Sequence, residues 1–188
     1  MNAKEALAVV HSARHARDVV VTTMTPARDW MTMPQSPLDL VLVPSAMSHA
    51  TSMGLGIALA QPERRVIICN GDGSMLMNLG SVVSIVASGA RNVVVIVFDN
   101  GTYEVTGSQP VPGGGATDFA MIARGAGVRA VFDFSTLEEW RAGIASVLNT
   151  DGPAFVVLHV EPVLGQPGPR SPGPAGERAR RLMDALQR

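Results

Sequence analysis

The chain has 188 residues and a formal net charge of −1 at pH 7, with 46% hydrophobic and 16% charged residues. This length suits one domain with a full hydrophobic core, and the hydrophobic content excludes a disordered chain. The near-neutral charge argues against nucleic-acid and membrane-surface binding, and the shortage of charged residues, against roughly 25% in an average soluble domain, suggests that another subunit covers part of the surface.

The first half of the chain alternates between helical and strand patterns. Helical spacing of apolar residues indicates a helix, and short β-branched runs indicate buried strands. In chain order we expect a helix, a strand, a proline-rich loop, a strand, a helix and a strand, at residues 2–16, 19–23, 24–37, 40–43, 46–60 and 66–69. We expect the second helix, which is rich in small residues, to pack closely through Gly54 and Gly56.

The second half continues this alternation. In chain order we expect a helix, a strand, a glycine-rich loop, a strand, a helix, a strand, a Pro/Gly-rich arm and a terminal helix, at residues 75–88, 93–98, 110–118, 130–132, 135–148, 154–160, 161–176 and 177–187. Thr117 or Asp118 caps a further short helix that ends at Arg124. Ser135 begins Ser-Thr-Leu-Glu, which we interpret as a capping box with Glu138.

This alternation predicts an α/β fold with an open six-stranded, mainly parallel sheet and helices on both faces. We divide the chain into one domain over residues 1–162 and a Pro/Gly-rich arm with a C-terminal helix over residues 163–188. In such folds ligands bind beyond the carboxyl ends of the strands. The loops after the strands are therefore where functional residues are expected.

The cysteine content and the first residues bear on the cellular location. A single cysteine, Cys69, excludes an internal disulfide, a zinc cluster and an iron–sulfur cluster, and its free thiol fits a reducing compartment. The beginning of the sequence carries Lys4 and Glu5 without an apolar segment, so we expect no signal peptide. The apolar runs are also too short to span a bilayer. We therefore expect a cytoplasmic protein.

Two polar loops follow successive predicted strands. The first, Asn70-Gly71-Asp72-Gly73-Ser74, opens a helix whose free N–H groups attract an anion. Asp72 would repel a phosphate unless a divalent cation bridged the two. The second loop, at residues 99–102, contains Asn100, which offers a neutral oxygen ligand. Each motif alone is also typical of an ordinary turn, but the pair predicts a metal–phosphate site suited to Mg²⁺.

Together these loops resemble the diphosphate-binding motif of thiamine-diphosphate enzymes, in which Gly-Asp-Gly is followed, after a spacer, by Asn. The flanking sequences resemble those of the sulfopyruvate and phosphonopyruvate decarboxylase group, in the subunit or half-chain that binds the diphosphate. The segments that carry this resemblance are residues 56–65, 71–74, 76–80 and 99–109. It covers most of the chain and is weakest over residues 24–37 and 161–176. It implies the thiamine-diphosphate-binding fold, with thiamine diphosphate and Mg²⁺ as cofactors.

The resemblance assigns roles to individual residues. It implies that Asp72 and Asn100 bind Mg²⁺ through their side chains and that Thr102 does so through its carbonyl oxygen. At the other end of the cofactor, Ser45 would offer a carbonyl to the aminopyrimidine, and Met47 would wedge the cofactor into a bent shape, although residue chemistry alone would place Met47 in the core. The implied cofactor-binding set is Ser45, Ala46, Met47, Gly71, Asp72, Gly73, Ser74, Asn100, Thr102 and Tyr103.

In the family, a glutamate from a separate pyrimidine-binding domain drives proton transfer at the cofactor. This chain has room for one α/β unit only, so we expect no catalytic residue in it and infer a partner alpha subunit that supplies the glutamate. We also expect a second copy of this chain in the hetero-oligomer. The candidate contacts with a small 2-oxo acid substrate are His49, Glu104, Thr106 and Gln109. For each of them an ordinary packing role is at least as well supported.

The resemblance therefore predicts one subunit of a two-chain 2-oxo acid decarboxylase. One alternative is a carboligase or acyl transferase subunit, since the same chemistry can deliver the carbonyl fragment to an aldehyde. A non-catalytic cofactor-binding module is another, against which the presence of Asp72, Asn100 and Met47 argues. A subunit that passes electrons to ferredoxin is disfavoured by the single cysteine. No cationic cluster identifies a sulfonate or phosphonate group, so the particular 2-oxo acid stays open.

Overall fold

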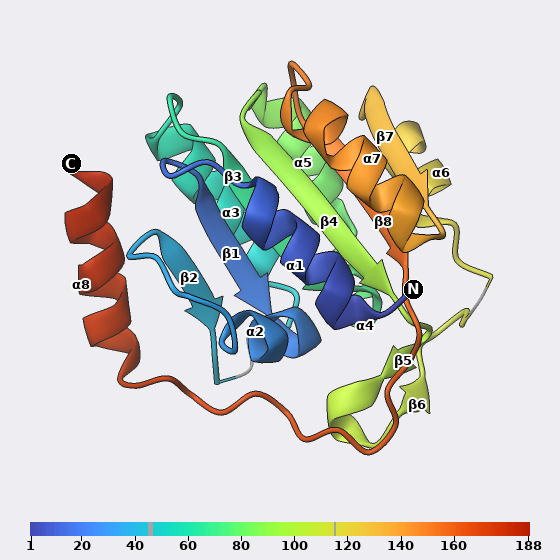
Figure 1. Ribbon diagram of the computed structural model, residues 1–188. Helices are drawn as coiled ribbons and strands as arrows, with labels where there is room; N and C mark the ends of the chain where they lie inside the picture. Colours follow the sequence, from blue (N-terminus) through green and yellow to red (C-terminus); the bar gives the residue numbers. More distant parts are fainter. Residues whose placement is uncertain (45–46, 115) are drawn as a thin grey trace.

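The chain is built around a six-stranded sheet (Figure 1). The computed structural model describes residues 1–44, 47–114 and 116–188. All strand pairs in this sheet are parallel, and the strand order is β2-β1-β3-β4-β8-β7. The strands are β1 (Val19–Thr23), β2 (Asp39–Leu42), β3 (Val66–Gly71), β4 (Val93–Asp99), β7 (Ala130–Phe134) and β8 (Ala154–His159). The predicted open parallel sheet is confirmed.

Helices cover both faces of the sheet, so its central strands are apolar on both sides. One face carries α1 (Ala3–Ala13), α2 (Met24–Trp30) and α7 (Leu137–Leu148), and the other carries α3 (Ala50–Ala60), α4 (Asp72–Leu76), α5 (Gly80–Ser88) and α6 (Phe119–Gly125). In Figure 1, α1 and α7 lie in front of the strands and α3 and α5 behind them. Trp30 and Trp140 fill the first core, and Met75 and Ile85 fill the second.

The proline-rich segment at residues 24–37 is not entirely a loop, as the sequence suggested. Its first part forms α2, which follows β1 directly. Pro26 lies in the first turn, where a missing N–H group breaks no helical hydrogen bond. Ala27 and Trp30 are fully buried against the sheet. Tertiary packing therefore overrides the proline signal.

The predicted helix over residues 75–88 is also wrong in its extent. The helical structure begins earlier, at Asp72, and a turn at residues 77–79 separates α4 from α5. In this turn the Asn78 side chain donates to the Ser48 carbonyl, and the Asn78 carbonyl accepts from Ser81 N–H at 3.1 Å. The Asn78 side chain thus ties the turn to a neighbouring loop, and the backbone does not continue as one helix through residues 77–79.

Two other helix details differ from the prediction. The capping box of α7 joins Thr136 to Glu139, one residue later than the predicted Ser135 and Glu138. On α3, Gly54 packs closely as expected, because a Cβ atom there would lie 2.4 Å from Ile68 Cδ1. Gly56 was expected to do the same, but nothing lies within 4 Å of its Cβ position. Asp118 caps α6 by accepting from Met121 N–H at 2.7 Å.

Two parts of the chain lie outside the main sheet. A small antiparallel hairpin joins β5 (Thr102–Tyr103) to β6 (Gln109–Pro110) through a 3₁₀ turn, η1 (Glu104–Thr106). Its strands are too short for a sequence pattern to reveal. After β8, residues 161–174 contain no helix or strand, and α8 (Ala175–Leu186) follows. Within the described residues, no helix has the length and apolar character needed to cross a membrane.

The arm brings α8 to the far side of the sheet, beside the edge strand β2 (Figure 1). Leu182 is buried in the second core. The Arg178 guanidinium donates to the carbonyl oxygens of Val41, in β2, and of Val43, just after it. They lie on the edge of β2 that no strand of the described residues covers. The terminal helix thus closes this edge with one apolar anchor and one polar anchor.

Candidate functional site

The strand order creates a crevice between β1 and β3. From β1 the chain passes outward to β2 and then returns across β1 to form β3, so the connections after β1 and β3 leave in opposite directions. Ligands of open α/β sheets bind at such a point. Here residues 24–26, 71–74 and 102–105 line a pocket together with Met47 and Asn100. The cavity has a volume of about 30 Å³, room for about one water molecule.

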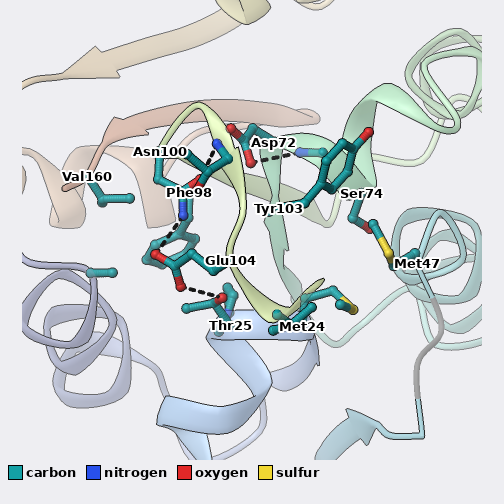
Figure 2. Close-up of a pocket in the computed structure, with 16 residues that line it drawn as sticks. Met24, Thr25, Met47, Asp72, Ser74, Phe98, Asn100, Tyr103, Glu104 and Val160 are labelled. Carbon is teal, nitrogen blue, oxygen red and sulfur yellow. Dashed lines mark hydrogen bonds between the residues drawn. The ribbon is translucent and has the colours of Figure 1, made fainter. Parts of the chain in front are cut away.

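Asp72 links the two polar loops. The β3–β4 register pairs Gly71 with Phe98, so the residues that follow each strand are neighbours. Asp72 is only 2% exposed. Its Oδ1 accepts from Gly73 N–H (Figure 2) and its Oδ2 from Gly101 N–H, both at 2.7 Å. Each carboxylate oxygen thus has one backbone donor and retains a lone pair.

The electrostatics of this carboxylate favour a cation. Burial raises the pKa of Asp72 to about 7 despite its two backbone donors, and the carboxyl of Asp99 raises it further. Burial also raises the pKa of Asp99, against the opposing effect of His159. No lysine, arginine or histidine of the described residues forms an ion pair with Asp72. A divalent cation would supply the missing positive charge, so the residues fit such an ion.

Asn100 is held at both ends of its amide. Its Oδ1 accepts from Thr102 N–H at 2.9 Å and from the Thr102 hydroxyl at 3.3 Å. Its Nδ2 donates to Glu104 Oε1 at 2.9 Å. Glu104 is 4% exposed and lies in the same pocket. The amide oxygen of Asn100 therefore faces the loop and its nitrogen faces Glu104 (Figure 2).

Gly73, Ser74 and Met47 lie on the other side of Asp72. A Cβ atom on Gly73 would come 2.3 Å from Tyr103 Cε1, so only glycine allows the tyrosine ring to lie against this turn. The Ser74 hydroxyl accepts from Ser48 N–H at 3.0 Å, which ties the segment after Met47 to the Gly-Asp-Gly turn. In Figure 2, Met47 lies beside Ser74, and the Tyr103 ring lies above the pocket.

The pocket gathers most of the predicted cofactor set, and the predicted substrate set divides. Ser45 and Ala46 lie outside the described residues. His49 is exposed and its Nδ1 bonds the Met47 carbonyl oxygen, while Thr106 and Gln109 are exposed and bond each other. These three do not line the pocket. The role of each residue toward a cofactor or substrate stays a prediction.

Glu104 lines the pocket, but its carboxylate is occupied by other parts of the chain. Thr25, Asn100 and Val163 all donate to it. These contacts favour a role within the loop rather than the substrate contact suggested by the sequence. A glutamate in a polar stretch shows no sign of burial in the sequence.

Other chemistries find less support in the described part of the chain. No group of three or more His, Cys, Asp or Glu side chains there could hold a metal ion. A metal at this pocket would therefore need amide and backbone oxygens beside Asp72. Cys69 is fully buried, and burial raises the pKa of its thiol far above the usual range, which suits packing rather than nucleophilic chemistry.

Comparison with known protein families and sequences places this geometry in context. The family model described as "Thiamine pyrophosphate enzyme, C-terminal TPP binding domain" matches residues 18–158. A phosphonopyruvate decarboxylase of Streptomyces hygroscopicus is 36% identical over 81% of this chain and 38% of its own length. The sulfopyruvate decarboxylase subunit beta of Methanothermobacter thermautotrophicus is 36% identical over 73% of this chain and 70% of its own. The chain thus spans less than two fifths of the first relative and over two thirds of the second.

A solved structure shares the fold. It is the X-ray structure of a putative thiamin diphosphate-dependent enzyme isolated from Mycobacterium smegmatis, with a TM-score of 0.74 and 22% sequence identity. The match covers 87% of this chain and 32% of that chain. At this identity the likeness concerns the fold alone.

Proposed function

Because this chain belongs to the family of thiamine pyrophosphate-enzyme C-terminal TPP-binding domains, we propose that it binds thiamine diphosphate with Mg²⁺ at the crevice between β1 and β3. We propose further that it is the diphosphate-binding subunit of a two-chain decarboxylase acting on a 2-oxo acid, similar to sulfopyruvate or phosphonopyruvate. The observation that carries the proposal is the convergence of Asp72 and Asn100 with the Gly73–Ser74 turn in one pocket.

Each residue of the predicted cofactor-binding set has a task in this proposal. Asp72 and Asn100 would hold Mg²⁺, with the Thr102 carbonyl as a further ligand, and the start of α4 at Gly73 and Ser74 would receive the diphosphate. Met47 would support the bent shape of the cofactor, with Ser45, Ala46, Gly71 and Tyr103 around it. When bound, thiamine diphosphate supplies an electron sink for the electrons released as carbon dioxide leaves the 2-oxo acid. This chain therefore binds and orients, and we assign it no proton-transfer residue.

Three observations support a partner chain. First, relatives named sulfopyruvate decarboxylase subunit beta imply another subunit in those enzymes. Second, the cavity is far smaller than the roughly 300–1,000 Å³ of typical ligand pockets, so most of a cofactor would lie outside it. Third, large apolar side chains on α3, on α5 and in the turn between α4 and α5 are about half exposed, namely Met53, Leu59, Met77 and Val83. A pyrimidine-domain alpha subunit that supplies a glutamate, and a second copy of this chain, would cover such surface.

Carboligation is the second candidate. The observation in its favour is a relative named putative acetolactate synthase large subunit IlvB2 of Mycobacterium tuberculosis, which is 31% identical over 65% of this chain and 23% of its own length. A carboligase would need an acceptor aldehyde or 2-oxo acid at the same pocket. The residues described here contain nothing that selects for the acceptor.

Reconstitution tests the proposed function. The chain alone should bind thiamine diphosphate weakly in the presence of Mg²⁺ and show no turnover. Addition of a pyrimidine-domain subunit should give carbon dioxide release from one member of a 2-oxo acid panel. Product formation only in the presence of an acceptor would favour carboligation. Binding without either activity would leave a cofactor-binding module, and substantial turnover by the chain alone would contradict the two-chain arrangement.

The metal assignment has its own test. Asp72→Ala should abolish Mg²⁺-dependent binding of thiamine diphosphate, measured by isothermal titration calorimetry, because it removes the charged ligand. Asp151→Ala, which removes an exposed carboxylate whose ion-pair partner among the described residues is Arg91, is the matched control and should bind as the wild type does. Unchanged affinity in Asp72→Ala would refute the ligand assignment.

A further inference from the structure

Glu104 is a buried carboxylate that accepts a hydrogen bond from the Asn100 side chain. The proposed metal site alone gives no reason for its burial. Glu104 begins η1, and its side chain is 1% exposed. Its ion-pair partner among the described residues is Arg28, whose Nη2 atom lies 3.9 Å from Glu104 Oε2, beyond hydrogen-bond distance. Burying a charged group is unfavourable unless its oxygens are well bonded. The contacts that satisfy this carboxylate therefore indicate what it does.

Three segments that are distant from one another in the sequence donate hydrogen bonds to the Glu104 carboxylate. Oε1 accepts from Asn100 Nδ2 at 2.9 Å and from Val163 N–H at 2.8 Å. Oε2 accepts from the Thr25 hydroxyl at 2.9 Å. The carboxylate is thus fixed by α2, by the proposed metal loop and by the start of the arm. Its rotamer cannot change without breaking at least one of these bonds.

The consequence for Asn100 follows from hydrogen-bond chemistry. An asparagine amide has two ends of similar shape, of which only the oxygen can bind a cation. Glu104 Oε1 also accepts from the Val163 N–H group and so acts as an acceptor, which means that the end of Asn100 that meets it must be the nitrogen. The Thr102 donors select the oxygen at the opposite end. In Figure 2, Glu104 lies below Asn100 and Asp72 lies above it.

We propose that Glu104 is a positioning residue that fixes the Asn100 amide with its oxygen toward the cation. The inference rests on the proposed magnesium–diphosphate site and names the residue that prepares one of its ligands before the metal arrives. Partners that orient metal ligands in this way typically contribute about 10- to 100-fold to metal affinity. Glu104 would act through Asn100 and would not touch the metal.

The variants separate a hydrogen-bonding role from a role of charge. Glu104→Gln can keep its oxygen on Asn100 Nδ2 and Val163 N–H, while its new NH₂ group donates to the Thr25 hydroxyl, which can also accept. Glu104→Leu keeps the volume and removes every acceptor. Glu104→Met, with a similar length, covers the case in which the leucine variant does not fold. Glu138→Leu, at an exposed position on α7, is the matched control.

The measurement is the apparent affinity for Mn²⁺ in the presence of saturating thiamine diphosphate, followed through the electron paramagnetic resonance signal of free Mn²⁺ on the full chain. We expect Glu104→Leu, or Glu104→Met, to bind Mn²⁺ about 10- to 100-fold more weakly. Glu104→Gln should stay within about threefold of the wild type, because its hydrogen bonds are retained. Circular dichroism confirms folding of each variant, and Glu138→Leu should bind normally.

A double-mutant cycle tests whether the effect passes through Asn100. On the Asn100→Ala background, Glu104→Leu should cause no further loss of Mn²⁺ affinity, because the group it orients is gone. If Glu104→Leu lowers Mn²⁺ affinity on the Asn100→Ala background by the same factor as on the wild type, the inference is overturned. It is also overturned if folded Glu104→Leu binds Mn²⁺ as tightly as the wild type, or if Glu104→Gln loses as much affinity as Glu104→Leu. Absence of Mn²⁺ binding by the wild-type chain would instead contradict the proposed function itself, and the inference with it.

Discussion

At the scale of single residues, the chemistry of this protein depends on which polar groups the carboxyl edge of the sheet buries. Asp72 is buried with two N–H donors and no cationic side chain of the described residues in contact, whereas Cys69, three residues earlier, is buried among apolar groups. Burial raises the pKa of both. For Asp72 this fits the proposed cation site, and for Cys69 it disfavours the reactive thiolate.

Cys69 should therefore be inert in the folded protein. Its pKa is raised by burial and further by the charge of Asp39, so the thiol stays protonated well above pH 9. We expect no reaction of the native chain with 5,5′-dithiobis(2-nitrobenzoate) at pH 9, and one equivalent of thiol released in 8 M urea. Stoichiometric labelling of the native protein within minutes would show that the strand end opens and would contradict this prediction.

The residues of the site were not equally predictable from the sequence. Asp72 and Asn100 stand out because they follow directly on two buried apolar runs, and parallel strands bring their carboxyl ends together. Glu104 stands out much less, because its burial depends on Thr25 and Val163, which lie 79 and 59 residues away in the chain. A contact between such distant segments leaves no periodic signal in the sequence around Glu104.

At the scale of helices and strands, local patterns predicted the type of element well and its ends less well. The six strands lie where apolar β-branched runs predicted them, β1 with the predicted ends and the others with one or both ends shifted by at most two residues. Helix ends were harder, since in Ser135-Thr136 either hydroxyl could begin a capping box and only the backbone conformation decides between them. Thr136 is extended and accepts from Glu139 N–H at 3.2 Å.

The capping box of α7 gives a paired test. Thr136→Ala should lower the free energy of unfolding by about 1 kcal/mol, because it removes an N-cap acceptor. Ser135→Ala should change it by less than about 0.5 kcal/mol, since among the described residues Ser135 contacts Glu139 through its backbone N–H group, which the substitution keeps. Urea unfolding followed by tryptophan fluorescence measures both. A larger loss of unfolding free energy in Ser135→Ala than in Thr136→Ala would contradict this assignment and favour the Ser135 cap expected from the sequence.

The packing of α3 gives a second paired test, on two glycines of one helix. In Gly54→Ala the new Cβ would lie 2.4 Å from Ile68 Cδ1 and 2.5 Å from Ile68 Cγ1, so the core must shift, and we expect a loss of about 1–2 kcal/mol. Gly56→Ala meets open space and should gain up to about 1 kcal/mol from helix propensity. The midpoint temperatures of thermal unfolding of the two variants should therefore shift in opposite directions from that of the wild type. Shifts of the same sign would contradict the close approach at Gly54.

At the scale of the whole molecule, the sheet is protected on three sides by this chain. Helices cover its two faces, and α8 reaches the free edge of β2 by way of the extended arm (Figure 1). The sequence predicted the arm and the terminal helix but not where they dock. Their position depends on Leu182 and Arg178 meeting β2 and its neighbours, more than 130 residues earlier in the chain.

Docking of α8 should depend on Leu182 more than on any exposed residue beside it. Leu182 is 6% exposed and Met183 is 58% exposed, so the same charge added at the two positions has different consequences. Leu182→Asp would bury an unpaired carboxylate in an apolar core, and release of α8 costs less than that burial. We expect the amide hydrogens of α8 to exchange at the rate of unstructured chain in this variant, measured by mass spectrometry.

The uncovered edge of β2 should then promote self-association, visible by light scattering after size exclusion, because an exposed strand edge is a template for pairing. Met183→Asp should keep both the protection of α8 and the oligomeric state of the wild type. Protected α8 amides in Leu182→Asp would mean that Arg178 and its two carbonyl partners hold the helix without the apolar anchor.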